Sequence, residues 1–263
     1  MIDSHCHLFF DNLSNKIDEI IKNAISSQIT AILTINTNPD HFTKHYNLID
    51  KYKSIFISYG LHPDEVNDLN LLSSNEIDSF CNLDKVIGIG ETGLDFFHSI
   101  ENKTLQIKSF ENHIESSYKN DLPLIIHQRN SEKEIIDILK FYIKSKPLKI
   151  VFHCFTGSKI LMNFCIDNNF YMSLSGIVTF KNADDLRNII KNIPIELLLI
   201  ETDSPFLSPV PKRGKQNEPS NVKYIAEYLS NFYDIPIQEF ILNTDNNFYK
   251  LFSKAIRYNG ISL

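Results

Sequence analysis

Cysteine is scarce in this sequence, and its four copies lie far apart. Cys6, Cys81, Cys154 and Cys165 form no CxxC spacing, so they predict free, reduced thiols and not a disulfide framework or a zinc knuckle. Long apolar runs are also missing, because charges break the hydrophobic stretches, and this excludes a membrane span. The first residues lack both the basic and the apolar segment of a signal peptide. We therefore expect a cytoplasmic protein without a membrane partner.

An excess of positive charge is absent too. Lysine and arginine number 26 against 32 aspartates and glutamates, which gives a formal net charge of −6. A protein that coats nucleic acid needs a broad basic surface, so the sequence argues against that class. An enzyme that holds one or two phosphates through a few local cations remains compatible with this charge.

No internal repeat, low-complexity stretch or linker divides the chain, so we expect one domain over residues 1–263. Short β-branched runs alternate instead with longer amphipathic segments. The runs predict strands at 2–8, 30–36, 54–62, 85–93, 122–129, 149–155, 171–176 and 196–203. Helical patterns include 14–28, 101–120, 131–143 and 184–192, and a final pair at about 219–232 and 236–257. Eight strands, each followed by a helix, predict an α/β fold of the (β/α)₈ TIM-barrel type, which needs about 250 residues.

Polar residues gather where the predicted strands end. Seven of them hold this position, namely His5, His7, His62, Glu91, His127, His153 and Asp203. The carboxyl ends of barrel strands share one face, where active sites are built. We therefore expect these side chains, far apart in the chain, to meet in one pocket.

The string SHCHL places two histidines two residues apart in a strand. His5 and His7 then project to the same side while Cys6 points away. Such a pair can hold one metal ion through two imidazole nitrogens. A chance pair on a surface strand is the alternative.

The string GIGETGLDF presents Glu91 among three glycines, where we expect a sharp turn after the strand. A carboxylate can bridge two cations, one oxygen to each, whereas a solvated glutamate at an ordinary turn is the alternative. His127 and His153 each follow a buried-looking strand, and each is either a ligand or a hydrogen-bonded core histidine. Asp203 is either a ligand or a turn cap, and Glu201, one step deeper, is suited to orient a ligand.

Together, four histidines and two carboxylates supply ligands for two divalent cations, and Mg²⁺, Mn²⁺ and Zn²⁺ all accept such ligands. Two cations about 3.5–4 Å apart can clamp a phosphodiester. The loop 204–219 concentrates Lys212, Arg213 and Lys215, and Arg129 follows His127. These cations are either phosphate contacts or solvated surface charges.

Seven strings in order, SHCHL, GLHP, GETGLDF, HQR, HCFTGS, ETDSPFL and RGKQNEP, resemble the TatD family of metal-dependent deoxyribonucleases. The resemblance implies an amidohydrolase-type barrel that hydrolyses DNA, often from the 3′ end. It implies that one metal is bound by His5, His7, Glu91 and Asp203, and that Glu91 bridges to a second metal bound by His127 and His153. His62 resembles the family's substrate-contacting histidine. The chain departs from the family at His98, where an arginine is common, and at Asn130, where an acidic residue is usual.

We therefore expect a DNA substrate and no obligate protein partner. Asp203, Glu91 and His62 are the candidate catalytic residues, and His62, Arg129, Arg213 and Lys215 the candidate substrate contacts. An amidohydrolase or a D-aminoacyl-tRNA deacylase on the same barrel is the alternative enzyme. A non-enzymatic binding protein is the alternative outside enzymes, and it predicts no chelator-sensitive turnover.

Overall fold

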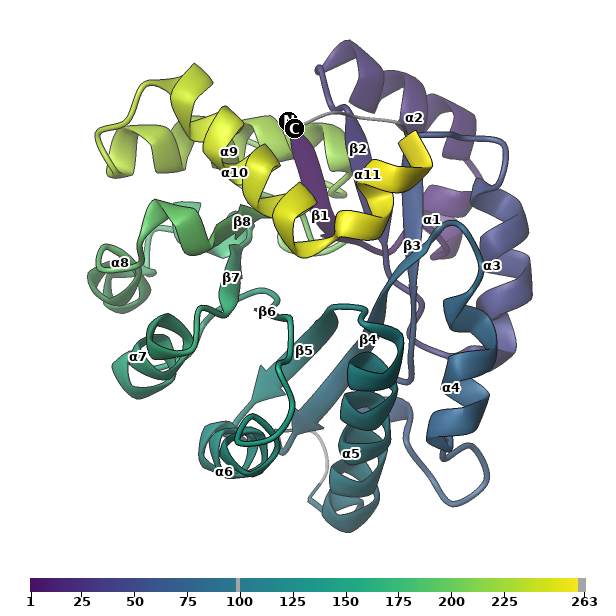
Figure 1. The fold of residues 1–263 in the computed structure, drawn as a ribbon. Helices are drawn as coiled ribbons and strands as arrows, with labels where there is room; N and C mark the ends of the chain where they lie inside the picture. The colour runs from purple at the N-terminus through teal and green to yellow at the C-terminus, as the bar shows by residue number, and fades with distance from the viewer. Residues whose placement is uncertain (98–99, 260–263) are drawn as a thin grey trace.

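The computed structural model describes residues 1–97 and 100–259 (Figure 1). Its strands form one parallel sheet whose neighbours follow the order of the chain from β1 to β8. The strands are β1 Ile2–Cys6, β2 Ala31–Thr34, β3 Ile55–Tyr59, β4 Val86–Asp95, β5 Leu124–Arg129, β6 Ile150–Phe152, β7 Tyr171–Leu174 and β8 Leu198–Ile200. The predicted (β/α)₈ barrel is confirmed.

Helices surround the sheet (Figure 1). They are α1 Asp11–Ser14, α2 Ile17–Ser26, α3 Phe42–Ile49, α4 Ser74–Cys81, α5 Lys103–Asn120, α6 Glu132–Tyr142, α7 Lys159–Asp167, α8 Asp184–Ile190, α9 Val222–Phe232, α10 Ile237–Leu251 and α11 Ser253–Asn259. Short 3₁₀ turns include η1 Pro39–His41, η2 Pro63–Glu65 and η4 Ile195–Leu197. None of the helices in the described ranges combines the length and the apolar character needed to cross a bilayer.

Several predicted boundaries were wrong. The helical pattern at 14–28 corresponds to α2, which begins three residues later and ends two residues earlier. The last pattern is divided between α10 and α11 at Phe252, whose ψ of 56° leaves the helical region. The last strand is shorter than predicted, because residues 195–197 form η4 and β8 ends at Ile200. Asn130 is exposed after β5 with a φ of 53°, and His98 lies outside the described residues.

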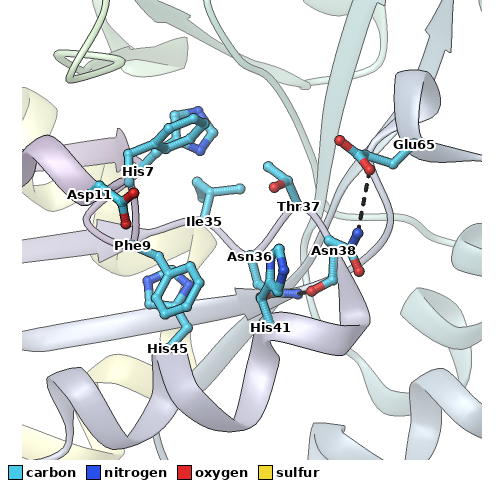
Figure 2. A pocket seen from close by; sticks show the side chains of 11 residues that line it. His7, Phe9, Asp11, Ile35, Asn36, Thr37, Asn38, His41, His45 and Glu65 are labelled. Atoms are coloured by element: carbon cyan, nitrogen blue, oxygen red, sulfur yellow. Dashed lines mark hydrogen bonds between the residues drawn. The ribbon is translucent and has the colours of Figure 1, made fainter. Parts of the chain in front are cut away.

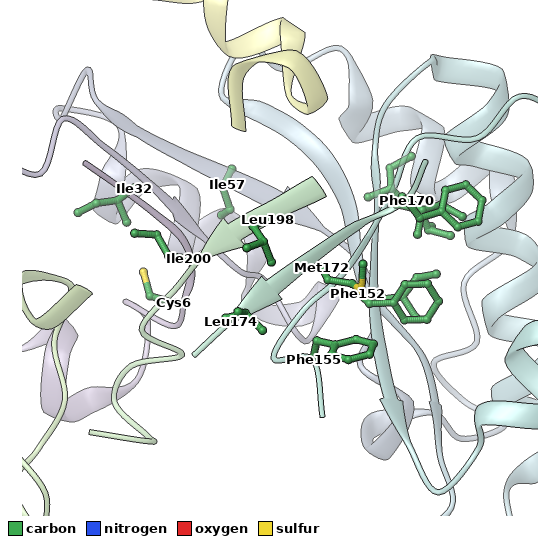
Figure 3. Close-up of a cluster of buried hydrophobic side chains, with 14 of the residues drawn as sticks. Cys6, Ile32, Ile57, Phe152, Phe155, Phe170, Met172, Leu174, Leu198 and Ile200 are labelled. Carbon is green, nitrogen blue, oxygen red and sulfur yellow. The ribbon is translucent and has the colours of Figure 1, made fainter. Parts of the chain in front are cut away.

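Two apolar clusters occupy the two faces of the sheet. Neighbouring strand residues alternate between them. Ile32 joins the larger cluster, to which α1 to α10 contribute, and Leu33 joins the smaller, to which later residues of α10 and residues of α11 contribute. Figure 3 shows part of the larger cluster, with side chains from β1, β2, β3, β6, β7 and β8. The smaller cluster fills the barrel interior. The Met1 ammonium lies 3.3 Å from Asp245 of α10, so this helix covers the amino end of the barrel and leaves the carboxyl end for a site.

A bulge in β1 turns the histidine pair inward. Asp3 pairs with Ile32 and Cys6 with Thr34, which is three steps on β1 against two on β2. Ile2 therefore faces the interior cluster whereas Cys6 faces the outer one, although strict alternation would put both on one face. His5 and His7, opposite to Cys6, consequently point into the barrel.

Candidate metal centre

The side chains of His5 and His7, at the end of β1, approach one carboxylate oxygen of Asp203, which follows β8. The Nε2 atoms of His7 and His5 lie 3.2 Å and 3.7 Å from Asp203 Oδ1. Backbone bonds hold this contact, since Asp203 N donates to His5 O at 3.0 Å and His7 N donates to Ser204 O at 2.7 Å. The Asp203 carbonyl also accepts from Phe206 N at 3.0 Å, so Asp203 forms a turn through its backbone while its carboxylate faces the histidines.

Glu91 lies between these residues and a second group of histidines. Its Oε2 is 3.4 Å from His5 Nε2 and 4.0 Å from His7 Nε2. Its Oε1 is 2.7 Å from His153 Nε2 and 3.0 Å from His127 Nδ1. One carboxylate oxygen therefore faces each half of the site, and the structure brings all six candidate ligands together.

The glycines around Glu91 allow its strand to continue and do not end it. The predicted turn here was wrong, because β4 runs on to Asp95. Gly90 has a φ of 134°, and a Cβ on it would lie 2.5 Å from Ile125 O. Gly93 has a φ of 136°, and its Cβ would lie 2.0 Å from His127 O. Only glycine lets β4 approach β5 this closely, and this approach sets Glu91 beside His127.

Two carboxylates outside the ligand group orient its histidines. Asp95 Oδ2 lies 2.9 Å from His127 Nε2, which keeps a proton on Nε2 and the Nδ1 lone pair toward Glu91. Glu201 is fully buried, 3.4 Å from His153 Nδ1, and accepts a hydrogen bond from Cys154 N. Such outer carboxylates fix the tautomer of a metal-binding histidine. Asp95 was not among the predicted site residues, although strand alternation places residues 91, 93 and 95 on the same face of β4.

The charged groups of the site favour the binding of a cation. Burial alone raises the pKa of Glu91, but the charges of His153 and His62 and a hydrogen bond from His127 hold this pKa well below its usual range. Burial lowers the pKa of His153, yet the Glu91 carboxylate and Glu201 together raise it well above the usual value. Burial and the neighbouring His153 lower the pKa of His5. The Glu91 carboxylate thus stays ionised and attracts cations.

Buried polar atoms without partners support a metal in this site. Both ring nitrogens of His5, the Nδ1 of His7 and the Oε2 of Glu91 are buried and have no hydrogen-bond partner among the described residues. Buried polar atoms are normally paired. Donor atoms of His5, His7 and Asp203, and those of His5, Glu91 and His153, lie within 4.8 Å of one another. Imidazole nitrogens mixed with carboxylate oxygens suit divalent cations.

His62 approaches the site from the loop after β3. Its Nε2 is 3.4 Å from Glu91 Oε1, close enough to form a third potential ligand group with Glu91 and His127. However, His62 Nδ1 accepts a hydrogen bond from Asp64 N at 3.1 Å. In the neutral ring the proton is then on Nε2, so this nitrogen is a hydrogen-bond donor and not a free lone pair.

The predicted substrate cations differ in position. Arg129 lines a cavity of about 470 Å³ that is also lined by all the candidate ligands except His5, and its guanidinium lies 3.8 Å from the centre of the Phe97 ring. Arg213 and Lys215 are not among the described residues that line this cavity. Arg213 lies over the Phe180 ring at 3.8 Å, and the backbone carbonyl of Lys215 accepts from Ser208.

Comparison with known proteins identifies the family. The family of TatD-related DNases matches residues 2–253. The chain belongs to the TatD family. A metal-dependent hydrolase of Buchnera aphidicola, described as uncharacterized, is 40% identical over 262 residues, which is 96% of this chain and 99% of the relative. A Bacillus subtilis hydrolase with the same description is 35% identical and covers 96% and 98%.

Solved structures agree with this family. The crystal structure of a TatD-family hydrolase from Entamoeba histolytica is 26% identical, with a TM-score of 0.84 and coverage of 96% of this chain and 97% of that one. The crystal structure of a TatD homologue from Escherichia coli has a TM-score of 0.86 at 24% identity, with coverage of 96% and 98%. Family, fold and ligand group together make this TatD-family chain a metal-dependent hydrolase.

Proposed function

We propose that this TatD-family hydrolase is a deoxyribonuclease that cleaves DNA phosphodiester bonds from the 3′ end with the help of two divalent cations. The observation that carries the proposal is the position of Glu91, which directs one oxygen to His5 and His7 and the other to His127 and His153. His5, His7, Glu91 and Asp203 would hold one cation. Glu91, His127 and His153 would hold the other.

Hydrogen-bond donors around the ligands support a phosphate substrate. His62 presents Nε2–H to the cavity that the ligands line, and the guanidinium of Arg129 lies on its wall. Both groups suit the non-bridging oxygens of a phosphodiester. The cavity volume of about 470 Å³ leaves room for a phosphodiester group and its neighbouring sugar.

When bound, divalent cations would lower the pKa of the attacking water and neutralise charge on the phosphate. Asp203 accepts a hydrogen bond from the attacking water and then its proton as the new P–O bond forms. The bond to the leaving nucleoside oxygen breaks, that oxygen takes up a proton from solvent water, and Asp203 returns its own proton to solvent. Burial raises the pKa of Asp203, but His7 and its neighbours lower it overall, so the carboxylate is ionised and ready to accept.

Cleavage of a 5′-labelled DNA oligonucleotide tests the proposal. The protein is stripped with EDTA and then given Mg²⁺, Mn²⁺ or Zn²⁺ in turn, and products are resolved on a sequencing gel. We expect a ladder that shortens from the 3′ end, and only when a cation is present. Full activity in excess EDTA, or no cleavage with any cation while a D-aminoacyl-tRNA is hydrolysed, would overturn the nuclease assignment.

A further inference from the structure

A second cavity of about 310 Å³ adjoins the metal centre (Figure 2). His7, Phe10, Thr37 and Glu65 line both cavities. The walls of this side pocket come from the segments after β1 and β2 and from α3. The two cavities are therefore neighbours, and a group joined directly to a phosphate in the metal cavity would lie next to the side pocket.

Rings form one wall of the side pocket. Phe9 stacks on His45 with a centroid separation of 5.1 Å and lies 5.5 Å from the ring of His41. Burial lowers the pKa of His45 to about 3, and its Nε2 is hydrogen-bonded to the Thr34 hydroxyl at 2.9 Å, so this ring is uncharged. Flat aromatic walls favour a flat ligand that can stack.

Charge excludes a phosphate from the side pocket. Among the described residues that line it there is no lysine or arginine, whereas the carboxylates of Asp11 and Glu65 are present. These carboxylates would repel a phosphate. The cations that would compensate its charge lie in the neighbouring metal cavity. The pocket therefore suits an uncharged group with hydrogen-bond donors.

Asn36 supplies an unused acceptor. It is 1% exposed, and its Nδ2 donates to Asn38 O at 3.0 Å, a bond visible in Figure 2. Its Oδ1 has no hydrogen-bond partner within the described parts of the chain, and the side chain lines the pocket. By contrast, both polar atoms of the Asn38 side chain have partners, because its Nδ2 donates a hydrogen bond to Glu65 and its Oδ1 accepts one from Asp40 N. An amide oxygen beside aromatic rings matches the N–H groups on the edge of a nucleobase.

We propose that the side pocket binds the base of a nucleotide next to the phosphodiester held in the metal cavity, and this inference rests on the proposed nuclease function. Phe9 and His41 stack on the base, and Asn36 accepts a hydrogen bond from its edge. Stacking of this kind tolerates all bases, because each has an aromatic face.

The test compares substrates with and without a base. Single-stranded 5′-labelled oligonucleotides carry either normal 3′ ends or an abasic residue at the last or the penultimate position. We expect the wild-type protein to show a KM about tenfold higher for one of the abasic substrates, with little change in kcat. Phe9→Leu and the exposed His41→Ala should raise KM for the normal substrate and remove this difference. Phe141→Ala, which removes a 71% exposed ring at the end of α6, is the matched control and should keep it.

Binding without cleavage separates this inference from the nuclease assignment. The same oligonucleotides, with phosphorothioate linkages at the 3′ end that keep the negative charge and resist cleavage, are titrated by fluorescence anisotropy in the presence of metal. A base-dependent Kd that both pocket variants lose supports the side pocket even if no DNA is cut. Equal Kd values for normal and abasic DNA in the wild type would overturn it. Undiminished discrimination in Phe9→Leu and His41→Ala would overturn it as well.

Discussion

Asp95 offers the most direct test of how the metal centre is organised. Its Oδ2 lies 2.9 Å from His127 Nε2, and the side chain is 1% exposed, so water screens this contact weakly. Asp95→Asn keeps the size of the side chain but removes the charge that makes His127 Nδ1 more basic. Loss of such an outer carboxylate costs about 10–100-fold in metal affinity, or roughly 1.4–2.7 kcal/mol.

Two measurements check this prediction. Calorimetric titration of stripped protein with a divalent cation should give the weaker affinity. NMR titration of the metal-free protein should show a lower pKa for His127, because burial lowers this pKa and Asp95 is the first of the groups that raise it. Asp78→Asn is the control, since Asp78 bonds Ser116 and Lys119 on the helical side of the barrel and should leave both values unchanged. An affinity within about twofold of wild type, with an unaltered His127 pKa, would refute the reasoning.

Three further predictions concern turnover, substrate binding and stability. Asp203→Asn should lower kcat on DNA at least about a hundredfold with metal still bound; a near-normal rate would leave Asp203 as a turn residue only. Arg129→Ala, at the wall of the metal cavity, should raise KM for DNA and reduce the slope of log affinity against log salt concentration by about 0.7, and normal cleavage at every salt concentration would contradict this. His113 is buried with a pKa lowered to about 4 from 6.5, so the unfolded chain binds its proton first as the pH falls. The wild type should lose about 1.4 kcal/mol of unfolding free energy relative to His113→Gln between about pH 7.5 and 5.5; parallel denaturation curves would exclude this.

Much of the fold could be predicted from the apolar pattern of the strands. Runs such as IVF before His153 and LIIH up to His127 are apolar on both faces, because a parallel strand in a barrel is buried on both sides. The polar residue at the end of each run is then conspicuous, and its place on the carboxyl face follows from the direction of the strands. These local features led from the sequence to the ligand group.

Contacts between distant segments could not be predicted in this way. The bulge in β1 that turns His5 inward depends on pairing with β2, and the backbone bond from His7 to Ser204 joins the segments that follow the first and the last strand. The hydrogen bond that fixes the His62 tautomer comes from its own turn, but its distance to Glu91 depends on the approach of β3 to β4.

The sequence by itself therefore determined the order of the elements, the barrel and the residue types at its carboxyl end, because burial and strand alternation act on neighbours along the chain. Only the tertiary structure decided which oxygen of Glu91 faces which histidine, that Asp95 supports His127, and that Arg213 lies on Phe180 and not beside the ligands. The side pocket that Phe9, Asn36 and His41 line also arises only in the tertiary structure. The physical reason is that these features arise from packing between segments through space, which no pattern of adjacent residues encodes.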